Sequence, residues 1–243
     1  MSTPPTTKQQ AGAPLDDMQG TKPVSARQGF DAAALGAWLE AHVPAYPGGA
    51  PAVEQFKGGQ SNPTFKLRAG AQQYVLRTKP GPAAKLLPSA HAIEREFRVM
   101  AALHGAGFPV PRQLALCTDE SIIGRAFFVM EFIEGRILWD QSLPGMTPAE
   151  RAAIYDEQNR VIAQLHTVDF AAIGLQDYGK PGNYFARQIE RWTRQYQASS
   201  TEPIEAMDRL IAWLPQHIPA GEDTSIVHGD FRMDNLVFHP TEP

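Results

Sequence analysis

The sequence predicts an α+β fold with a β-rich first half and a helical second half, and three observations support this class. Five segments alternate apolar and polar residues or are continuously apolar, as strands are. They are 52–56, 64–69, 74–78, 112–117 and 126–133. One amphipathic stretch, 89–107, lies between the third and the fourth, and after Gly135 apolar residues recur at helical spacing. Three strands, a helix and two strands indicate an antiparallel sheet that carries one helix.

The chain is predicted to begin with a disordered tail. Residues 1 to about 28 are rich in Pro, Thr, Gln and Gly and hold few large apolar side chains, so they cannot bury enough surface to offset chain entropy. A short helix follows, with Asp31 as its N-cap and with Leu35, Trp38 and Leu39 on one apolar face. This helix opens the first predicted lobe, residues 29–134.

The strands of this lobe include a predicted hairpin. In "TFKLRA", Phe65 and Leu67 alternate with Lys66 and Arg68, and the turn "GAQQ" leads into "YVLRT". The stretch 89–107 is predicted to be a helix that ends at its glycines.

Residues 135–243 are predicted to form a helical lobe. In "TPAERAAIYDEQNRVIAQLH", Thr147 and Glu150 have the spacing of a capping box, and Pro148 takes the first helical position. Two further stretches, 183–196 and 204–214, place their apolar residues on one helical face.

Composition excludes several classes of protein. The 243 residues are 43% hydrophobic and 20% charged, which is globular, and a net charge of -4 offers no basic field for nucleic acid. Cys117 is the single cysteine, so an internal disulfide framework and a zinc site made of cysteines are both excluded. No apolar run approaches the ~20 residues of a membrane span, and no apolar signal core is present. We expect a cytoplasmic protein that binds neither nucleic acid nor membrane.

The stretch "SIVHGDFRMDNLVFHP" carries the chemistry, and it is predicted to be a strand, a polar loop and a second strand. The spacing from Asp230 to Asn235 matches the catalytic loop H-R-D-x-x-x-x-N of kinases. Asp230 would be the base that accepts the hydroxyl proton, and Asn235 would offer its amide oxygen to Mg²⁺. His228 would brace the loop, and Arg232 could lie against the transferred phosphate.

The chain resembles the aminoglycoside phosphotransferase family of small-molecule kinases, which has the two-lobed protein-kinase-like fold. Within that family it is most similar to the branch of the kinase-like domains fused to some acyl-CoA dehydrogenases. The motifs that carry the resemblance are "GGQSNPTF", "YVLRTKP", "LLPSAHAIEREFRVMAAL", "FFVMEFIEGR", "PGNYFARQIERW" and "IVHGDFRMDNLVFHP". They extend from about residue 29 to the end, so the resemblance implies a β-rich nucleotide-binding lobe, a helical lobe and the cofactors ATP and Mg²⁺.

The resemblance also implies which residues bind the nucleotide. Five consecutive residues would form the loop over the phosphates: Gly58, Gly59, Gln60, Ser61 and Asn62. Arg77 would take the place of the phosphate-binding lysine, with Lys79 as the rival, and Glu96 would pair with that cation, with Glu94 as the alternative. Met130 would line the adenine pocket, and the backbones of Glu131 and Ile133 would bond to adenine.

One part of the family pattern does not appear in the chain. The family follows the catalytic loop with a strand and a second metal-binding acid, whereas this chain continues only as "FHPTEP". We therefore expect an incomplete, C-terminally truncated helical lobe, little kinase turnover from this chain by itself, and self-association through apolar faces around Leu165, Trp192 and Leu210.

Two classes of function remain open on the sequence alone. The first is an ATP-dependent kinase for a small-molecule hydroxyl, and its acceptor would be a hydroxyacyl compound by analogy with the acyl-CoA dehydrogenase branch. The second is a non-catalytic nucleotide-binding pseudokinase or interaction module. The presence of both Asp230 and Asn235 favours the kinase, because a non-catalytic module has no chemical need for that pair.

Overall fold

The computed structural model describes residues 19–58, 62–80, 93–221 and 223–243. The chain forms two compact units, one made of Met1–Gln164 with His228–Pro243 and the other of Leu165–Val227. These units do not coincide with the predicted lobes 29–134 and 135–243. The start of the helical lobe and the whole HGDFRMDN loop belong to the same unit as the sheet. The predicted catalytic and nucleotide-binding residues therefore all lie in the first unit.

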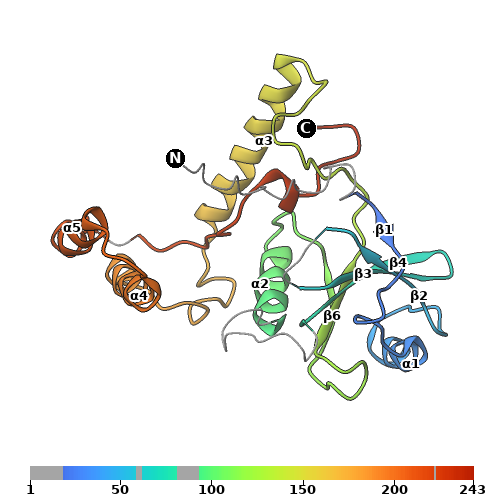
Figure 1. Ribbon diagram of the computed structural model, residues 1–243. Coiled ribbons are helices and arrows are strands. Elements are labelled where there is room, and N and C mark those ends of the chain that lie inside the picture. The colour runs from blue at the N-terminus through green and yellow to red at the C-terminus, as the bar shows by residue number, and fades with distance from the viewer. Residues whose placement is uncertain (1–18, 59–61, 81–92, 222) are drawn as a thin grey trace, which may run out of the picture. The chain divides into compact units, whose positions relative to one another are not determined.

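In the described part of the chain, six strands form one antiparallel sheet in the order β1-β2-β3-β4-β6-β5 (Figure 1). The strands are β1 Thr21–Lys22, β2 Ala52–Phe56, β3 Thr64–Ala69, β4 Gln72–Thr78, β5 Gln113–Cys117 and β6 Phe127–Glu131. The five predicted strands are therefore confirmed, and so is the α+β class. The predicted hairpin is formed by β3 and β4, in which Phe65 is opposite Leu76 and Leu67 is opposite Tyr74.

The sixth strand, β1, lies inside the segment that the sequence predicted to be a disordered tail. Thr21 pairs with Phe56 on β2, and its hydroxyl donates to a carboxylate oxygen of Glu54 at 3.0 Å. Farther along, the buried Arg125 donates to the side chain and the backbone carbonyl of Gln28, both at 2.6 Å. The prediction was wrong for this part of the tail because sheet pairing and a buried cation replace the missing apolar side chains. Residues 1–18 lie outside the described ranges.

The sheet buries both faces, one under each of two helices (Figure 1). Helix α1 (Ala32–His42) begins at Asp31, whose carboxylate accepts from the amides of Ala33 and Ala34, and it packs Leu35 and Leu39 on the face that holds Phe127. Helix α2 (Ile93–Gly105) packs on the face that holds Phe128. Consecutive residues of a strand point to opposite faces, so these two phenylalanines anchor the two layers.

Helix α3 (Pro148–Thr167) begins with the predicted capping box. The Thr147 amide donates to the Glu150 carboxylate at 2.7 Å, and the Glu150 amide donates back to the Thr147 hydroxyl at 3.3 Å. The helix contributes Ile154 to a small core with Leu143, Met233 and Phe238. This core lies directly beneath the HGDFRMDN loop.

The second unit contains α4 (Tyr184–Ser199), α5 (Glu205–Trp213) and a 3-10 turn, η2 (Leu214–Gln216). Both helices were predicted, but neither contains a buried residue. Trp192 and Leu210 are exposed as expected, whereas Leu165 is buried, so the expectation of an uncovered apolar face was wrong for Leu165. Among the helices in the described ranges, none combines the length and the apolar character needed to cross a bilayer.

Candidate active site

The HGDFRMDN loop holds Asp230 and Asn235 in direct contact. The Asn235 side-chain amide donates to the Asp230 carboxylate at 2.8 Å and to the Asp230 backbone carbonyl at 2.9 Å. A single 3-10 turn, η3 (Met233–Asn235), folds the loop back far enough for this contact. The amide nitrogen is thus committed to Asp230, while the amide oxygen remains as the group that can meet a cation.

His228 braces the loop through its ring nitrogen. The Asp230 backbone amide donates to Nδ1 of His228 at 3.3 Å, and the ring packs edge-on against Phe231. Desolvation by the surrounding loop lowers the pKa of His228, and the nearby Asp230 carboxylate opposes this shift, although the residue as a whole is solvent-exposed. The neutral ring that accepts this hydrogen bond is therefore the favoured form near pH 7, which fits the predicted bracing role.

Arg232 has a different immediate partner from the one the sequence suggested. Its guanidinium donates to both carboxylate oxygens of Asp234, through Nε at 3.0 Å and through Nη2, and it lies 4.0 Å from the Asp230 carboxylate. The hydrogen bond from Arg232 lowers the pKa of Asp234. Asp234 therefore orients the arginine beside Asp230. Sequence reasoning missed this role because the contact depends on the fold of the loop, in which Asp234 lies on the 3-10 turn η3 and Arg232 directly precedes that turn.

The loop is anchored by residues that follow β6, and the predicted flanking hairpin does not form. Instead, Phe238 pairs with Arg136 in an isolated bridge, with N···O distances of 2.8 and 2.9 Å. The Arg136 guanidinium also donates to the His239 carbonyl at 2.8 Å. The hairpin prediction was wrong because the segment after the loop finds its backbone partner in a distant part of the chain. The only sequence signal for this anchor is a Gly-Arg pair directly after an apolar strand.

Gly135 permits the close approach on which this bridge depends. A Cβ atom at this position would lie 2.3 Å from the Phe238 carbonyl oxygen and 2.5 Å from Cγ1 of Val237. A second anchor comes from α3, where the Gln158 amide donates to the Phe231 carbonyl at 3.3 Å. The HGDFRMDN loop is therefore held from both sides by backbone contacts and from beneath by Met233 and Phe238.

Both of the ion pairs that the sequence left as alternatives are present. The Arg77 Nε of β4 donates to a Glu96 carboxylate oxygen at 2.5 Å, and Lys79 lies 2.8 Å from Glu94. The predicted Arg77–Glu96 pair is confirmed as a contact, and its role toward a nucleotide stays a prediction. Lys79 and Glu94 form a separate pair one step along the same strand and helix.

The predicted phosphate loop is described only at its two ends. Gly59, Gln60 and Ser61 lie outside the described residues. Gly58 packs beneath an aromatic ring, because a Cβ atom there would lie 2.3 Å from Cη2 of Trp139. Asn62 is 1% exposed, and its side-chain amide donates to Glu96 at 2.6 Å. Its side chain therefore faces the protein interior, and the role of this loop toward phosphate stays a prediction.

The segment predicted to be the hinge leaves β6 as expected. Met130 packs against the core under α2, and Ile133 is 40% exposed. The Glu131 backbone amide donates to the Arg112 carbonyl at 3.0 Å, and the Glu131 carboxylate accepts from the Arg112 amide at 2.8 Å. The Glu131 N–H is thus already bonded within the protein, whereas Ile133 lies on an exposed segment. Bonding of the Glu131 and Ile133 backbones to adenine stays a prediction.

The side chains present could hold part of a magnesium site. Within the described ranges, no group of three His, Cys, Asp or Glu residues is placed to bind a metal. Mg²⁺ is commonly bound through one or two protein oxygens, with water and substrate phosphates completing its shell. The side-chain amide oxygen of Asn235 fits that pattern as one protein donor.

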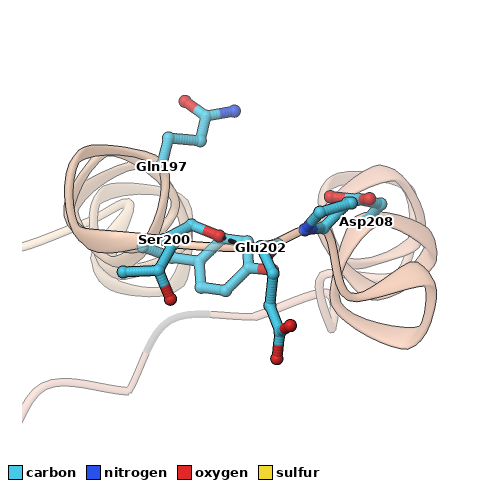
Figure 2. Close-up of a pocket in the computed structure, with 7 residues that line it drawn as sticks. Gln197, Ser200, Glu202 and Asp208 are labelled. Carbon is cyan, nitrogen blue, oxygen red and sulfur yellow. Dashed lines mark hydrogen bonds between the residues drawn. The ribbon is translucent and has the colours of Figure 1, made fainter.

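The second unit contains a depression of its own. It has a volume of about 360 Å³ and lies between the end of α4 and the start of α5 (Figure 2). Its lining consists of Tyr196, Gln197, Ser200, Thr201, Glu202, Pro203 and Asp208. It contains none of the residues predicted for catalysis or nucleotide binding, and the chemistry described above belongs to the first unit.

Comparison with known proteins gives one family. Residues 52–243 match the model of the phosphotransferase enzyme family. Mouse acyl-CoA dehydrogenase family member 10 is 49% identical over 230 residues, which are 94% of this chain and 21% of that protein. Rat acyl-CoA dehydrogenase family member 11 is 47% identical over 232 residues, 94% of this chain and 30% of that protein. The chain thus spans about a fifth to a third of the length of these curated relatives.

Solved structures agree with this match. A crystal structure from Ralstonia eutropha, of a protein described as a proposed aminoglycoside phosphotransferase, is 64% identical with a TM-score of 0.78 and covers 88% of this chain and 62% of that one. An aminoglycoside-3'-phosphotransferase of type VIII is 21% identical with a TM-score of 0.51, covering 76% of this chain and 64% of that one, and shows the shared fold alone. The predicted family resemblance and the kinase-like fold are both confirmed.

Proposed function

Because the chain belongs to the phosphotransferase enzyme family, we propose that it moves the γ-phosphate of ATP to a hydroxyl group of a small molecule, with Mg²⁺ as the metal. One observation supports this most strongly. The Asp230 carboxylate is held by the Asn235 amide at 2.8 Å in a loop with the spacing of a kinase catalytic loop. Phosphoryl transfer needs positioning and charge stabilisation more than covalent chemistry, and this loop supplies both.

In the proposed reaction Asp230 orients the acceptor hydroxyl and takes its proton as the new oxygen–phosphorus bond forms. The bond between the γ-phosphorus and the oxygen that bridges it to the β-phosphate breaks in the same step, and ADP leaves. Asn235 holds the carboxylate oxygen Oδ2 in place, which leaves Oδ1 as the oxygen free to face the acceptor. Arg232, oriented by Asp234 at 4.0 Å from Asp230, places positive charge next to the group in transfer. His228 fixes the backbone at Asp230 through its neutral ring.

The nucleotide would be held by cations of β4 and by the segment after β6. Arg77 suits phosphate because a guanidinium can form two parallel hydrogen bonds to phosphate oxygens. Its Nη2 has no acceptor among the described residues. Mg²⁺, when bound with ATP, neutralises phosphate charge, and the amide oxygen of Asn235 would hold it from the protein side.

The acceptor proposed is a hydroxyacyl compound. The support for this is analogy with the named relatives, which are acyl-CoA dehydrogenase family members. The dehydrogenase activity in those names does not pass to this chain, since the match covers only part of their length. Proteins with one fold accept different alcohols, so the acceptor must be tested directly.

The test begins with the affinity of the purified chain for Mg-ATP by calorimetry. Transfer of label from [γ-³²P]ATP is then measured to hydroxyacyl-CoAs, aminoglycosides, choline and homoserine. The expected result is ATP binding and acceptor-dependent transfer to a hydroxyacyl compound at a low rate, because we expect little turnover from this chain by itself. Transfer to aminoglycosides alone would overturn the acceptor class, and ATP binding without transfer to any alcohol would favour the alternative, a non-catalytic nucleotide-binding module.

We also propose that this chain self-associates through the second unit. Trp192 and Trp213 are 59% and 52% exposed on α4 and α5, and exposed apolar surface of this extent commonly marks an interaction site. Light scattering during gel filtration is expected to give a mass above that of the monomer. Replacing both tryptophans by serine should lower that mass, whereas Ile137→Ser, at a side chain 37% exposed in the first unit, should not. A monomer at every concentration tested would refute this expectation.

A further inference from the structure

Four residues close a ring of hydrogen bonds where the predicted phosphate loop meets the sheet. Asn62 donates its side-chain amide to Oε1 of Glu96 at 2.6 Å, and Glu96 accepts Nε of Arg77 on Oε2 at 2.5 Å. Nη1 of Arg77 donates to the Thr64 hydroxyl at 3.3 Å, and that hydroxyl donates to the Asn62 carbonyl at 3.1 Å. The ring joins Asn62, two residues before β3, to the strands β3 and β4 and to helix α2.

Asn62 is the buried member of this ring. Its side chain is 1% exposed, and its amide oxygen Oδ1 is buried without a hydrogen-bond partner among the described residues. Arg77 and Glu96 are more open, with side chains 30% and 31% exposed. A buried amide oxygen without a hydrogen-bond partner destabilises the folded state, so an apolar side chain would fill this position at less cost. We therefore infer that Asn62 serves through the hydrogen bond that its amide nitrogen donates to Glu96.

That contact decides how Glu96 meets Arg77. A carboxylate left to itself tends to bind guanidinium with both oxygens, through two parallel hydrogen bonds. Here Asn62 donates to Oε1 of Glu96, and Glu96 accepts only Nε of Arg77, on Oε2. A carboxylate that bound Arg77 with both oxygens from the Nε side would accept from Nε and from Nη2. Nη2 has no acceptor among the described residues. Asn62 thereby keeps one donor of the arginine available.

We propose that Asn62 is a positioning residue for the nucleotide, which acts through Glu96 to hold Arg77 in a one-point ion pair and so preserves an N–H donor for a phosphate oxygen. This inference rests on the proposed function, because it takes Arg77 as the phosphate-binding cation. It assigns Asn62 no direct contact with the ligand, in agreement with its burial.

The first test is a double-mutant cycle on Mg-ATP affinity. Asn62→Ala should raise the dissociation constant by about tenfold, the value of one average charge-assisted hydrogen bond. In a Glu96→Ala background the same change should have an effect below about twofold, because residues that act through one another are not additive. The melting temperature should change little in Asn62→Ala, since water can reach the half-exposed Glu96 carboxylate and the unpaired Oδ1 is removed.

The second test uses a near-isosteric change that titrates. Asn62→Asp places two carboxylates about as close as the present 2.6 Å contact, and two such groups share one proton with a raised pKa. The protonated form can donate to Glu96, so ATP affinity should be restored below that raised pKa and lost as the pH rises through it. The charged groups facing this point are Glu96 from α2 and Arg77 from β4, and Lys79 and Glu94 pair with each other beside them.

The matched control is Asn159→Asp, at an exposed position of α3. The dissociation constant for Mg-ATP of Asn62→Asp is divided by that of the unchanged chain at each pH. This ratio should fall by about tenfold from pH 8 to pH 6, the effect of one pKa unit. The same ratio for Asn159→Asp should not change with pH. Two results would overturn the inference, provided that the unchanged chain binds ATP. One is an equal effect of Asn62→Ala in the unchanged chain and in Glu96→Ala, and the other is a ratio for Asn62→Asp that does not change with pH. Failure of the unchanged chain to bind Mg-ATP would contradict the proposed function together with it.

Discussion

Asp230→Asn is expected to reduce phosphoryl transfer by about 10² to 10⁴-fold, the usual contribution of a positioned general base. An amide is nearly the same size as a carboxylate, and its oxygen can still accept the Asn235 amide that now lies 2.8 Å from Asp230. It cannot take the proton of the acceptor hydroxyl. The loss should therefore appear in the initial rate of ³²P transfer at saturating ATP, with the melting temperature unchanged.

The control for this change is Asp156→Asn, at an exposed position of α3 in the same unit. It removes the same charge from the chain without touching the loop, so its transfer rate should match that of the unchanged protein. Nucleotide affinity should also be nearly the same in both variants. Transfer by Asp230→Asn at the rate of the unchanged chain would show that Asp230 is not the base.

Gly135→Ala should both destabilise the first unit and disable the loop. The new methyl group would lie 2.3 Å from the Phe238 carbonyl oxygen, which is a backbone atom and cannot rotate away. Overpacking of this kind costs about 1–3 kcal/mol, and relief requires the bridge between Arg136 and Phe238 to open. Because Phe238 and Met233 anchor the loop on its small core, Asp230 should lose its fixed position as well.

Thermal unfolding and the transfer rate measure the two parts of this prediction. Gly105→Ala is the matched control, since no atom lies within 4 Å of its added Cβ and it ends α2. Alanine there reduces the entropy of the unfolded chain, so the control should be neutral or slightly stabilising. If Gly135→Ala had the same melting temperature as Gly105→Ala and the transfer rate of the unchanged chain, the bridge between Arg136 and Phe238 would not be what holds the loop.

Sequence reasoning was most accurate where the relevant partners are close in the chain. The capping box at Thr147 and the hairpin of β3 and β4 depend on contacts within a few residues, and both are present. The Asp230–Asn235 contact is of the same kind, because a five-residue spacing in one loop brings the two side chains together. The hairpin predicted around that loop failed for the opposite reason, since Phe238 pairs with the distant Arg136.

The sequence by itself determined the α+β class, the order of the elements, the family and the residues of the HGDFRMDN loop, because hydrophobic periodicity and motif spacing are local properties. Only the tertiary structure decided that β1 joins the sheet, that Asn62 faces inward to Glu96, and that Arg77 and Lys79 each have their own carboxylate. These outcomes depend on which of several chemically equivalent partners lies within hydrogen-bond distance. That distance is set by the packing of α2 against the sheet and of the loop against its core, and it has no counterpart in the spacing of residues along the chain.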